Sequence, residues 1–463
     1  MTLIKSISGI RGTLGGKPND TLSPLDIVKF TSAYATWVNQ KYPQHKNTII
    51  VGSDARPSRH MVGQIVMATL QAMGIHVIDL DLATTPTVEM YVTFAKAQGG
   101  IILTASHNPI EWNALKLLNE KGEFISAEEG ENIVKLAEKD DFNYATVQEI
   151  GTYTRKNDAL EQHINAILDL PLVKKELIEK ANFSVVIDAV NSVGGIAIPQ
   201  LLKALGVTKI KELHCTPNGY FPHNPEPLPE HLTEIAEEMK KQSYDIGIVV
   251  DPDVDRLALV CENGEMFGEE YTLVAIADYI LQNQKGATVS NLSSTKALKD
   301  ITEKYGQTYT AAAVGEVNVV KTMKSTQAVI GGEGNGGIIY PALHYGRDAL
   351  VGVALFLSHL AQKNIKVSAL REEYPHYAMS KNKITLSPDI EVDSILVAMK
   401  DKYKQQPINT EDGVKIHFEN AWVHLRKSNT EPIVRIYSEA PSMQEAESLI
   451  SQFKQDISLI CEN

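Results

Sequence analysis

Cysteines, long apolar runs and a targeting segment are scarce or missing in this sequence. Three cysteines occur in 463 residues, Cys215, Cys261 and Cys461, and none belongs to a C-x-x-C motif. This spacing argues against a disulfide framework and predicts reduced thiols. The longest strongly apolar stretch, residues 349–357, is about half the length of a membrane-spanning helix. The first residues show neither an apolar signal core nor a cleavage site. We therefore expect a cytoplasmic protein without a membrane partner.

An excess of basic residues is also missing. The chain has 44 Lys and Arg against 57 Asp and Glu, a formal net charge of −13, which disfavours a nucleic-acid partner. A small anionic substrate is compatible with this balance if arginines, lysines or a metal gather locally. The apolar fraction of 43% and the charged fraction of 22% are globular values, and the length predicts several domains.

Several segments follow the order strand, polar loop and amphipathic helix, which predicts α/β architecture. Three rounds of this order are visible. Residues 99–103 lead into TASHNP, residues 244–250 into DPDVDR, and residues 328–330 into GGEGNGG. Ligands of open α/β sheets bind beyond the carboxyl ends of strands, so we expect these three loops to carry the chemistry.

The last part of the sequence has a different pattern. Residues 413–418 and 433–438 alternate like half-buried strands, and residues 392–403 and 442–457 have helical spacing. The predicted fold is therefore three related α/β domains with mixed sheets and a smaller C-terminal α+β domain. The predicted domains are residues 1–150, 151–262, 263–372 and 380–463.

Three carboxylates, Asp251, Asp253 and Asp255, stand at alternate positions directly after an apolar strand. In a tight loop they can converge on one cation, and Mg²⁺ takes oxygen ligands while leaving positions for phosphate oxygens. An EF-hand calcium loop would accept Glu262 as its last ligand, but it needs glycine where Arg256 stands. A solvated acidic turn is the remaining alternative.

The hydroxyl of Ser106 follows the strand of residues 99–103 and is flanked by His107. A serine hydrolase would have the G-x-S-x-G pattern, and no glycine flanks this serine. The hydroxyl can instead carry a phosphoryl group, whose charge of about −1.5 to −2 would add an anionic ligand to a metal held by the aspartates. Alternatively, Ser106 and Asn108 make only turn hydrogen bonds.

Two later segments suit a phosphorylated sugar. Arg426, in RKSNT, and Arg435 can form a phosphate cradle together with hydroxyls and backbone N–H groups. Glu333 and Asn335 lie in a glycine-rich segment, and carboxylate and amide groups suit sugar hydroxyls. A surface turn and a mobile connection are the plainer alternatives. The histidines show no zinc-ligand spacing.

Five motifs occur in one order along nearly the whole chain: SGIRG, TASHNP, DPDVDR, GGEGNGG and RKSNTEP. In this order the chain resembles the α-D-phosphohexomutase superfamily, and it is most similar to phosphoglucosamine mutases, with phosphomannomutases and phosphoglucomutases as alternatives. The resemblance implies four domains around a central cleft. It also implies an enzyme that interconverts hexose 6-phosphate and hexose 1-phosphate, here glucosamine phosphates for cell-wall precursors, through a phosphoserine and a bisphosphate intermediate.

The resemblance further implies roles for individual residues. Ser106 matches the phosphoserine, and Lys116 is expected to be a general base with a lowered pKa. Arg11 is expected in a flexible turn near the transferred group, or alternatively in a buried ion pair. The implied catalytic residues are Ser106, Lys116, Arg11, Arg256 and His107. The implied Mg²⁺ ligands are Ser106, Asp251, Asp253 and Asp255, and the implied substrate-binding residues are Glu333, Asn335, Arg426, Ser428, Asn429, Thr430 and Arg435.

The implied cofactors are one Mg²⁺ per chain and a hexose 1,6-bisphosphate activator, and the implied partner is a phosphosugar bound by a monomer or homodimer. One position departs from the family pattern, because Gly337 stands where many members have an acid/base histidine; His344 and Arg347 are the nearby replacements. Closure about a hinge at residues 372–382 would exclude water from the phosphoserine. A metal-dependent phosphatase and a non-catalytic sugar-phosphate sensor are the rival functions.

Overall fold

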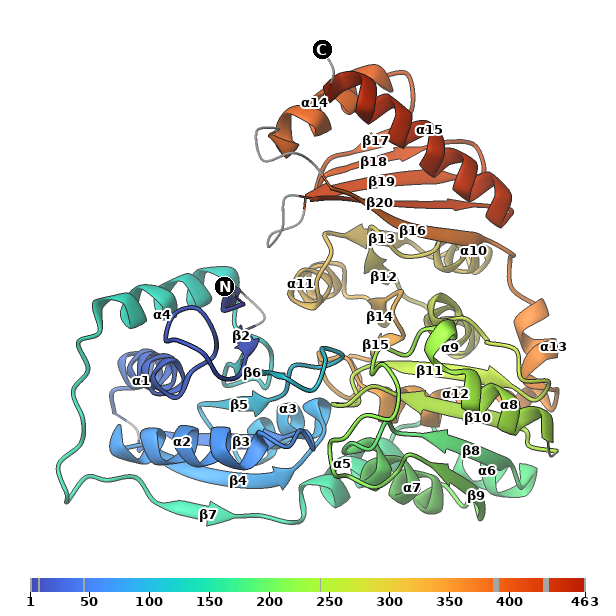
Figure 1. Ribbon diagram of the computed structural model, residues 1–463. Helices are drawn as coiled ribbons and strands as arrows, with labels where there is room; N and C mark the ends of the chain where they lie inside the picture. Colours follow the sequence, from blue (N-terminus) through green and yellow to red (C-terminus); the bar gives the residue numbers. More distant parts are fainter. Residues whose placement is uncertain are drawn as a thin grey trace. The chain divides into compact units, whose positions relative to one another are not determined.

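Figure 1 shows the computed structural model of the chain, which describes residues 2–6, 9–44, 46–241, 243–385, 391–427 and 433–461. The chain forms two compact units. Unit 1 consists of Met1–Thr272 and Asn335–Leu370, and unit 2 consists of Leu273–Gly334 and Arg371–Asn463.

Unit 1 begins with a seven-stranded mixed sheet of order β1-β2-β6-β5-β3-β4-β7. The four strands β5, β3, β4 and β7 pair in parallel, and β6, β2 and β1 are added antiparallel. The strands are β1 (Ile4–Ser6), β2 (Gly9–Thr13), β3 (Thr48–Ser53), β4 (His76–Leu82), β5 (Gly99–Leu103), β6 (Trp112–Leu118) and β7 (Tyr153–Arg155). The accompanying helices are α1 (Pro24–Lys41), α2 (Arg59–Ala72), α3 (Thr85–Phe94), α4 (Ala127–Lys139) and α5 (Ala159–Leu168).

The central strand β3 shows why this sheet has helices on both faces. Ile49 and Val51 belong to the core that includes α1, α2 and α4, whereas Ile50 belongs to the core that includes α3. Successive side chains of a strand point to opposite faces, so an apolar strand needs a covering layer on each side. This arrangement leaves the carboxyl ends of the strands as the place for polar loops.

The second sheet of unit 1 has the order β11-β10-β8-β9, with β10, β8 and β9 parallel and β11 antiparallel to β10. Its strands are β8 (Ser184–Asp188), β9 (Lys209–Leu213), β10 (Ile246–Val250) and β11 (Leu257–Cys261). The other elements of this part are α6 (Lys175–Ala181), α7 (Gly194–Ala204), the 3₁₀ turn Pro229–His231, α8 (Thr233–Lys241), β15 (Gly337–Ile339) and α12 (Ala349–Lys363). Helices α9 (Glu269–Asn283) and α13 (Val367–Glu372) cross a unit boundary.

The longest apolar stretch of the sequence is explained by helix α12. Every residue from Ala349 to Leu360 is buried, so the stretch is a core helix. Among the described residues, no helix combines the length and the apolar character needed to cross a membrane.

Unit 2 contains parallel strands in the order β13-β12-β14 and an antiparallel sheet in the order β16-β20-β19-β18-β17. Helices α14 and α15 lie on one face of the antiparallel sheet (Figure 1) and share its apolar core. The strands are β12 (Thr288–Asn291), β13 (Tyr309–Ala312), β14 (Ile330–Glu333), β16 (Ala378–Thr385), β17 (Ile408–Asn409), β18 (Val414–His417), β19 (Trp422–Lys427) and β20 (Ile433–Ala440). The helices are α10 (Ala297–Lys304), α11 (Glu316–Thr326), α14 (Val392–Lys402) and α15 (Met443–Cys461).

The predicted fold class is confirmed, since mixed α/β sheets precede an antiparallel C-terminal sheet with two helices. One local expectation differs from the structure. Arg11 does not lie in a flexible turn but in strand β2, where it pairs with Ala114 of β6, so its side chain is on the same face of the sheet as that of Lys116. The hinge at residues 372–382 stays a prediction; within this segment α13 ends at Glu372, and β16 begins at Ala378 and pairs with β20.

Candidate active site

Three buried aspartates form the centre of the site. Asp251, Asp253 and Asp255 lie in the loop between β10 and β11, and one oxygen of each carboxylate lies within 4.8 Å of the others. Asp251 Oδ1 accepts hydrogen bonds from the N–H groups of Asp255 (3.1 Å) and Arg256 (3.2 Å). Val254 has a φ of 65°. A β-branched residue rarely adopts this left-handed conformation, so the surrounding structure holds the loop in a strained shape.

Two cations contact these carboxylates. Lys116 Nζ lies 2.7 Å from Asp253 Oδ2 and 3.4 Å from Asp255 Oδ2, and Arg347 Nη2 lies 2.6 Å from Asp255 Oδ2. Burial raises the pKa of Asp251, and the two neighbouring carboxylates raise it further. Burial also acts to raise the pKa of Asp253, but Lys116 outweighs it and the pKa is lowered.

The donor set of the aspartates fits a metal ion. In the described part of the chain, no hydrogen-bond donor reaches the buried Oδ1 atoms of Asp253 and Asp255. Buried carboxylate oxygens without donors are costly, and a cation would offset that cost. A group of three carboxylates without nitrogen or sulfur ligands suits a hard divalent ion such as Mg²⁺. Asp251, Asp253 and Asp255 would hold such an ion.

The structure brings Ser106 next to the aspartates. The loop after β5 places its Oγ 2.8 Å from Asp251 Oδ2 and 3.4 Å from His107 Nδ1, while its N–H donates to Thr104 Oγ1 at 3.0 Å. Ser106 has a φ of 49°, which is also left-handed and uncommon for serine. The hydroxyl therefore contacts the acidic loop as well as its own turn.

Arg56, which the sequence analysis missed, holds the Ser106 loop. Its fully buried guanidinium pairs with Asp54 through Nε at 3.0 Å. Its Nη groups donate to the carbonyls of Ser106 (2.5 Å), Asn108 (2.7 Å) and Pro109 (2.6 Å). The rigid fork of a guanidinium can join several carbonyls in this way. The sequence contained one signal for Arg56, which is its position after the carboxyl end of a strand, β3.

Two of the predicted catalytic residues share a carboxylate. Arg256 Nη1 lies 3.2 Å from Glu226 Oε1, and His107 Nε2 lies 3.8 Å from the same oxygen. Desolvation lowers the pKa of His107, and the positive charge of Arg256 lowers it further. The structure therefore brings His107, Arg256 and Ser106 into one region of unit 1.

Lys116 does not have the lowered pKa that we expected. The expectation assumed that cations would be its main neighbours, whereas its ammonium contacts Asp253 and Asp255. Burial acts to lower the pKa of Lys116, but these two carboxylates outweigh burial and raise it. In this arrangement Lys116 is a charged group that compensates the acidic loop.

The glycine at position 337 leaves room for an arginine. A Cβ atom on Gly337 would lie 2.4 Å from Cδ of Arg347, closer than atoms can approach. Of the two nearby replacements for a histidine, Arg347 contacts Asp255, whereas His344 Nε2 lies 3.3 Å from Asp348 Oδ2. A guanidinium stays protonated, so Arg347 cannot take over proton transfer.

The two predicted sugar-binding side chains have partners within their own units. Glu333 ends β14 in unit 2, and its Oε1 accepts hydrogen bonds from Asn291 Nδ2 (2.9 Å) and the Gly315 N–H (3.2 Å). In unit 1, Asn335 Oδ1 accepts from the Gly337 N–H at 3.2 Å. Their contact with a sugar stays a prediction.

The predicted phosphate cradle contains two facing arginines. Arg426 of β19 and Arg435 of β20 are direct cross-strand partners. Arg426 Nε donates to Asp412 Oδ2 at 2.8 Å, and the side chain of Arg435 is exposed. Like charges in opposite positions repel, so a bound anion would stabilise this pair. The other predicted members, Ser428, Asn429 and Thr430, lie outside the described residues.

Comparison with known families places these elements in a known architecture. Four models of phosphoglucomutase/phosphomannomutase domains match the chain: alpha/beta/alpha domain I at residues 3–144, domain II at 161–264, domain III at 268–377 and the C-terminal domain at 381–455. A solved phosphoglucomutase/phosphomannomutase family protein from Burkholderia thailandensis has the same fold, with a TM-score of 0.84, 24% identity and coverage of 98% of this chain and 97% of that one.

Curated relatives are similar over nearly the whole length. A phosphoglucomutase/phosphomannomutase from Thermococcus kodakarensis is 34% identical, covering 94% of this chain and 95% of the relative. A phosphoglucosamine/phosphogalactosamine mutase from Sulfurisphaera tokodaii is 31% identical, covering 96% and 97%. The fold and the matches define an enzyme of the phosphohexomutase class, which transfers phosphate within a sugar phosphate. The chain belongs to the phosphoglucomutase/phosphomannomutase family, and the resemblance to the α-D-phosphohexomutase superfamily is confirmed.

Proposed function

We propose that the chain interconverts glucosamine 6-phosphate and glucosamine 1-phosphate through a phosphorylated Ser106 and a hexose 1,6-bisphosphate intermediate. The observation that carries the proposal is the 2.8 Å hydrogen bond between Ser106 Oγ and Asp251 Oδ2 at a group of three buried carboxylates. A phosphoryl group on this hydroxyl would lie beside a cation held by the aspartates.

The reaction consists of two phosphoryl transfers. In the first, a bond forms between phosphorus and a free sugar hydroxyl, the bond from phosphorus to Ser106 Oγ breaks, and the hydroxyl proton passes to a base in the site. In the second, a bond forms between Ser106 Oγ and the phosphorus of the other phosphoryl group, the bond from that phosphorus to the sugar oxygen breaks, and the base returns its proton to this oxygen. Such transfers depend on positioning and charge neutralisation, and Mg²⁺ neutralises phosphoryl oxygens when bound. Lys116, Arg256 and Arg11 supply the remaining positive charge.

The substrate's sugar and its second phosphate bind to the later motifs in this proposal. Glu333 and Asn335 bind sugar hydroxyls, and the facing pair Arg426 and Arg435 binds the phosphate that does not react. Residues 1–150 carry the phosphoserine, residues 151–262 the metal loop, residues 263–372 the sugar motif and residues 380–463 the phosphate cradle. Relatives named as phosphoglucosamine mutases favour the amino sugar. Glucose and mannose phosphates are the alternative substrates.

The first prediction tests Ser106. Wild-type protein with Mg²⁺ and a trace of hexose 1,6-bisphosphate should convert glucosamine 6-phosphate with a higher kcat/KM than glucose or mannose 1-phosphate. Ser106→Ala should lower turnover by at least about 10³-fold, because the group that carries the phosphate is gone. Intact-protein mass spectrometry should show one phosphoryl group on the wild type and none on the variant. Chelation of the metal should abolish turnover as well.

A matched control is Ser53→Ala, because Ser53 also lies at the carboxyl end of a strand, and within the described part of the chain its hydroxyl has one partner, the carbonyl of Asp81. This variant should keep wild-type turnover. Normal turnover of Ser106→Ala would disprove the phosphoserine. Release of free phosphate at the same rate as substrate is lost would support the rival function, a metal-dependent phosphatase, and reject the mutase.

A further inference from the structure

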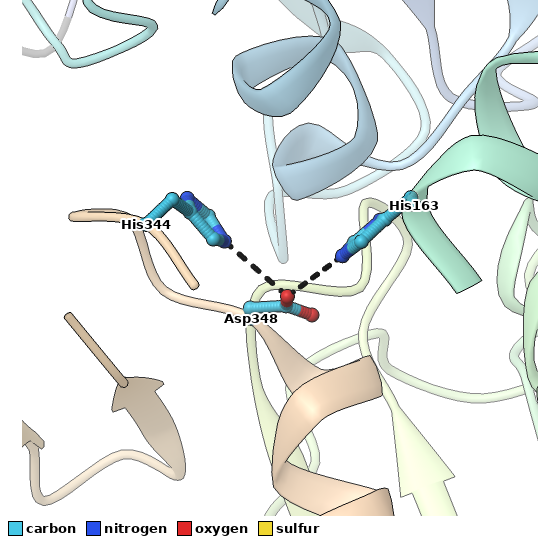
Figure 2. A group of neighbouring side chains, drawn as sticks. All are labelled: His163, His344 and Asp348. Atoms are coloured by element: carbon cyan, nitrogen blue, oxygen red, sulfur yellow. Dashed lines mark hydrogen bonds and ion pairs between the residues drawn. The ribbon is translucent and has the colours of Figure 1, made fainter. Parts of the chain in front are cut away.

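A second cluster of titratable side chains lies in unit 1, outside the aspartate loop. Figure 2 shows His163, from α5, and His344, from the segment before α12, approaching the carboxylate of Asp348 from two sides. Their Nε2 atoms lie 2.9 Å and 3.3 Å from the same oxygen, Asp348 Oδ2. The other oxygen, Oδ1, accepts hydrogen bonds from the N–H groups of Leu350 (2.8 Å) and Val351 (3.2 Å) at the start of α12. Both oxygens of this buried carboxylate are therefore bonded.

One side of the cluster reaches the aspartate loop through helix α3. His163 Nδ1 lies 3.0 Å from Thr87 Oγ1. In the same first turn of α3, Thr85 donates its hydroxyl to Asp253 Oδ2 at 2.5 Å and its N–H to the Asp253 carbonyl at 2.9 Å. His163 therefore contacts the helix end that holds Asp253.

The other side reaches the loop through the residue before Asp348. The N–H of Asp348 donates to the carbonyl of Ile338 at 2.8 Å, so its backbone is held as well as its side chain. The adjacent Arg347 extends over Gly337, where a Cβ atom would collide with it, and contacts Asp255 at 2.6 Å. A rotation of Asp348 would move Arg347, because the two residues share a peptide bond.

We propose that His163, His344 and Asp348 are positioning residues, which hold Arg347 against Asp255 and Thr85 against Asp253 and so fix the shape of the acidic loop. A buried network in which every member has a partner is rigid and specifies one arrangement. The expected fall in turnover rests on the proposed function, whereas the expected change in hydrogen exchange of the acidic loop does not. The loop is strained at Val254 and needs such support.

The same three side chains offer ligand atoms within 4.8 Å of one another, as a metal site does. Hydrogen bonds account for this arrangement, because a neutral imidazole can donate from Nε2 to the carboxylate and accept at Nδ1, as His163 can from Thr87. A bound metal ion is therefore an outcome that the experiment must distinguish.

The test uses Asp348→Asn in the full chain. Asparagine keeps the size of the side chain and can still accept from the N–H groups of α12, but it removes the charge that both imidazoles share. We expect faster hydrogen exchange in the peptide covering residues 251–256, measured without metal or substrate. We also expect kcat to fall at least about tenfold with KM within about twofold, as is usual when groups behind a metal ligand are lost. Arg347→Met should have a similar effect, and the double variant should be no slower than the single ones.

The matched control is Asp79→Asn in β4, another buried carboxylate that accepts from one side chain, the Tyr153 hydroxyl, and from one N–H group, that of Asp81. This variant should leave exchange of the acidic loop and kcat unchanged. Unchanged loop exchange in Asp348→Asn, or additive losses in the double variant, would overturn the proposal. One equivalent of Zn²⁺ or Mn²⁺ that is retained by the wild type and lost from Asp348→Asn would also overturn it. If the wild-type protein has no mutase activity but Asp348→Asn still speeds hydrogen exchange of the acidic loop, the proposed function is rejected and the positioning role is kept.

Discussion

At the residue scale, the buried arginine that holds the Ser106 loop depends strongly on its partners. Arg56 is fully buried and contacts one carboxylate and several carbonyls. Burial raises the pKa of Asp54, and Arg56 acts in the opposite direction. A buried ion pair with all its hydrogen bonds made is not strongly stabilising by itself, but a buried charge left alone is costly.

We therefore predict that Arg56→Met lowers the free energy of unfolding by about 3–5 kcal/mol, because Asp54 loses its partner inside the protein. Urea denaturation measures this loss. The control is Arg59→Met, which breaks the more exposed pair with Asp81 and should cost at most about 1 kcal/mol. Equal losses in the two variants would show that the buried pair has no special role.

At the element scale, strands β19 and β20 set two guanidiniums opposite each other. The register that pairs Arg426 with Arg435 also pairs Leu425 with Ile436 in the core, so it cannot shift without exposing apolar side chains. The two like charges are thus fixed by the register of the sheet, and although Asp412 pairs with Arg426, a bound anion would offset the remaining repulsion.

We predict that Arg435→Ala raises KM for the phosphosugar by about 10- to 100-fold, because a charged hydrogen bond to the phosphate is lost. The melting temperature should stay the same or rise, because the like-charge pair is removed. Steady-state kinetics and thermal unfolding measure the two effects. Lys427→Ala removes an equal charge from the neighbouring strand β19, where Lys427 pairs with Asp393, and should leave KM unchanged. If Arg435→Ala and Lys427→Ala have similar KM values, the assignment of the two arginines as a phosphate cradle is wrong.

At the scale of the whole molecule, acid should weaken unit 2 through a buried histidine. His424 lies between Ser293 Oγ (3.0 Å from Nδ1) and the carbonyl of Asp412 (2.6 Å from Nε2). Burial lowers its pKa from 6.5 to about 3. The unfolded chain takes up a proton below pH 6.5 while the folded chain does not, so stability falls as pH falls through this range.

We predict that unit 2 loses at most about 2 kcal/mol of stability between pH 6.5 and about pH 5 from this group, because the slope approaches 1.36 kcal/mol per pH unit only below the unfolded pKa. His424→Gln should lack this part of the slope. Hydrogen exchange of peptides from β18 to β20, compared between the two proteins at each pH, measures the difference. Parallel pH dependences would contradict the assignment.

Much of the fold followed from local patterns. The apolar strands β5, β10 and β20 were predicted because their residues alternate or cluster as buried strands do. Strand β6 was missed, because Asn113 and Lys116 interrupt its apolar pattern. Both side chains are buried all the same, since they face groups contributed by other parts of the chain, namely Ser58 and Asp253. A sequence window around β6 contains none of those partners.

The sequence by itself determined which chemical groups the protein has, in which order, and at which strand ends they occur, because strand periodicity and loop composition are local properties. Only the tertiary structure decided that Lys116 pairs with Asp253, that Arg56 holds the serine loop, and that His163 pairs with Asp348, the residue next to Arg347. These features depend on distances between residues far apart in the chain and on the burial of their side chains, and a local sequence pattern contains neither quantity.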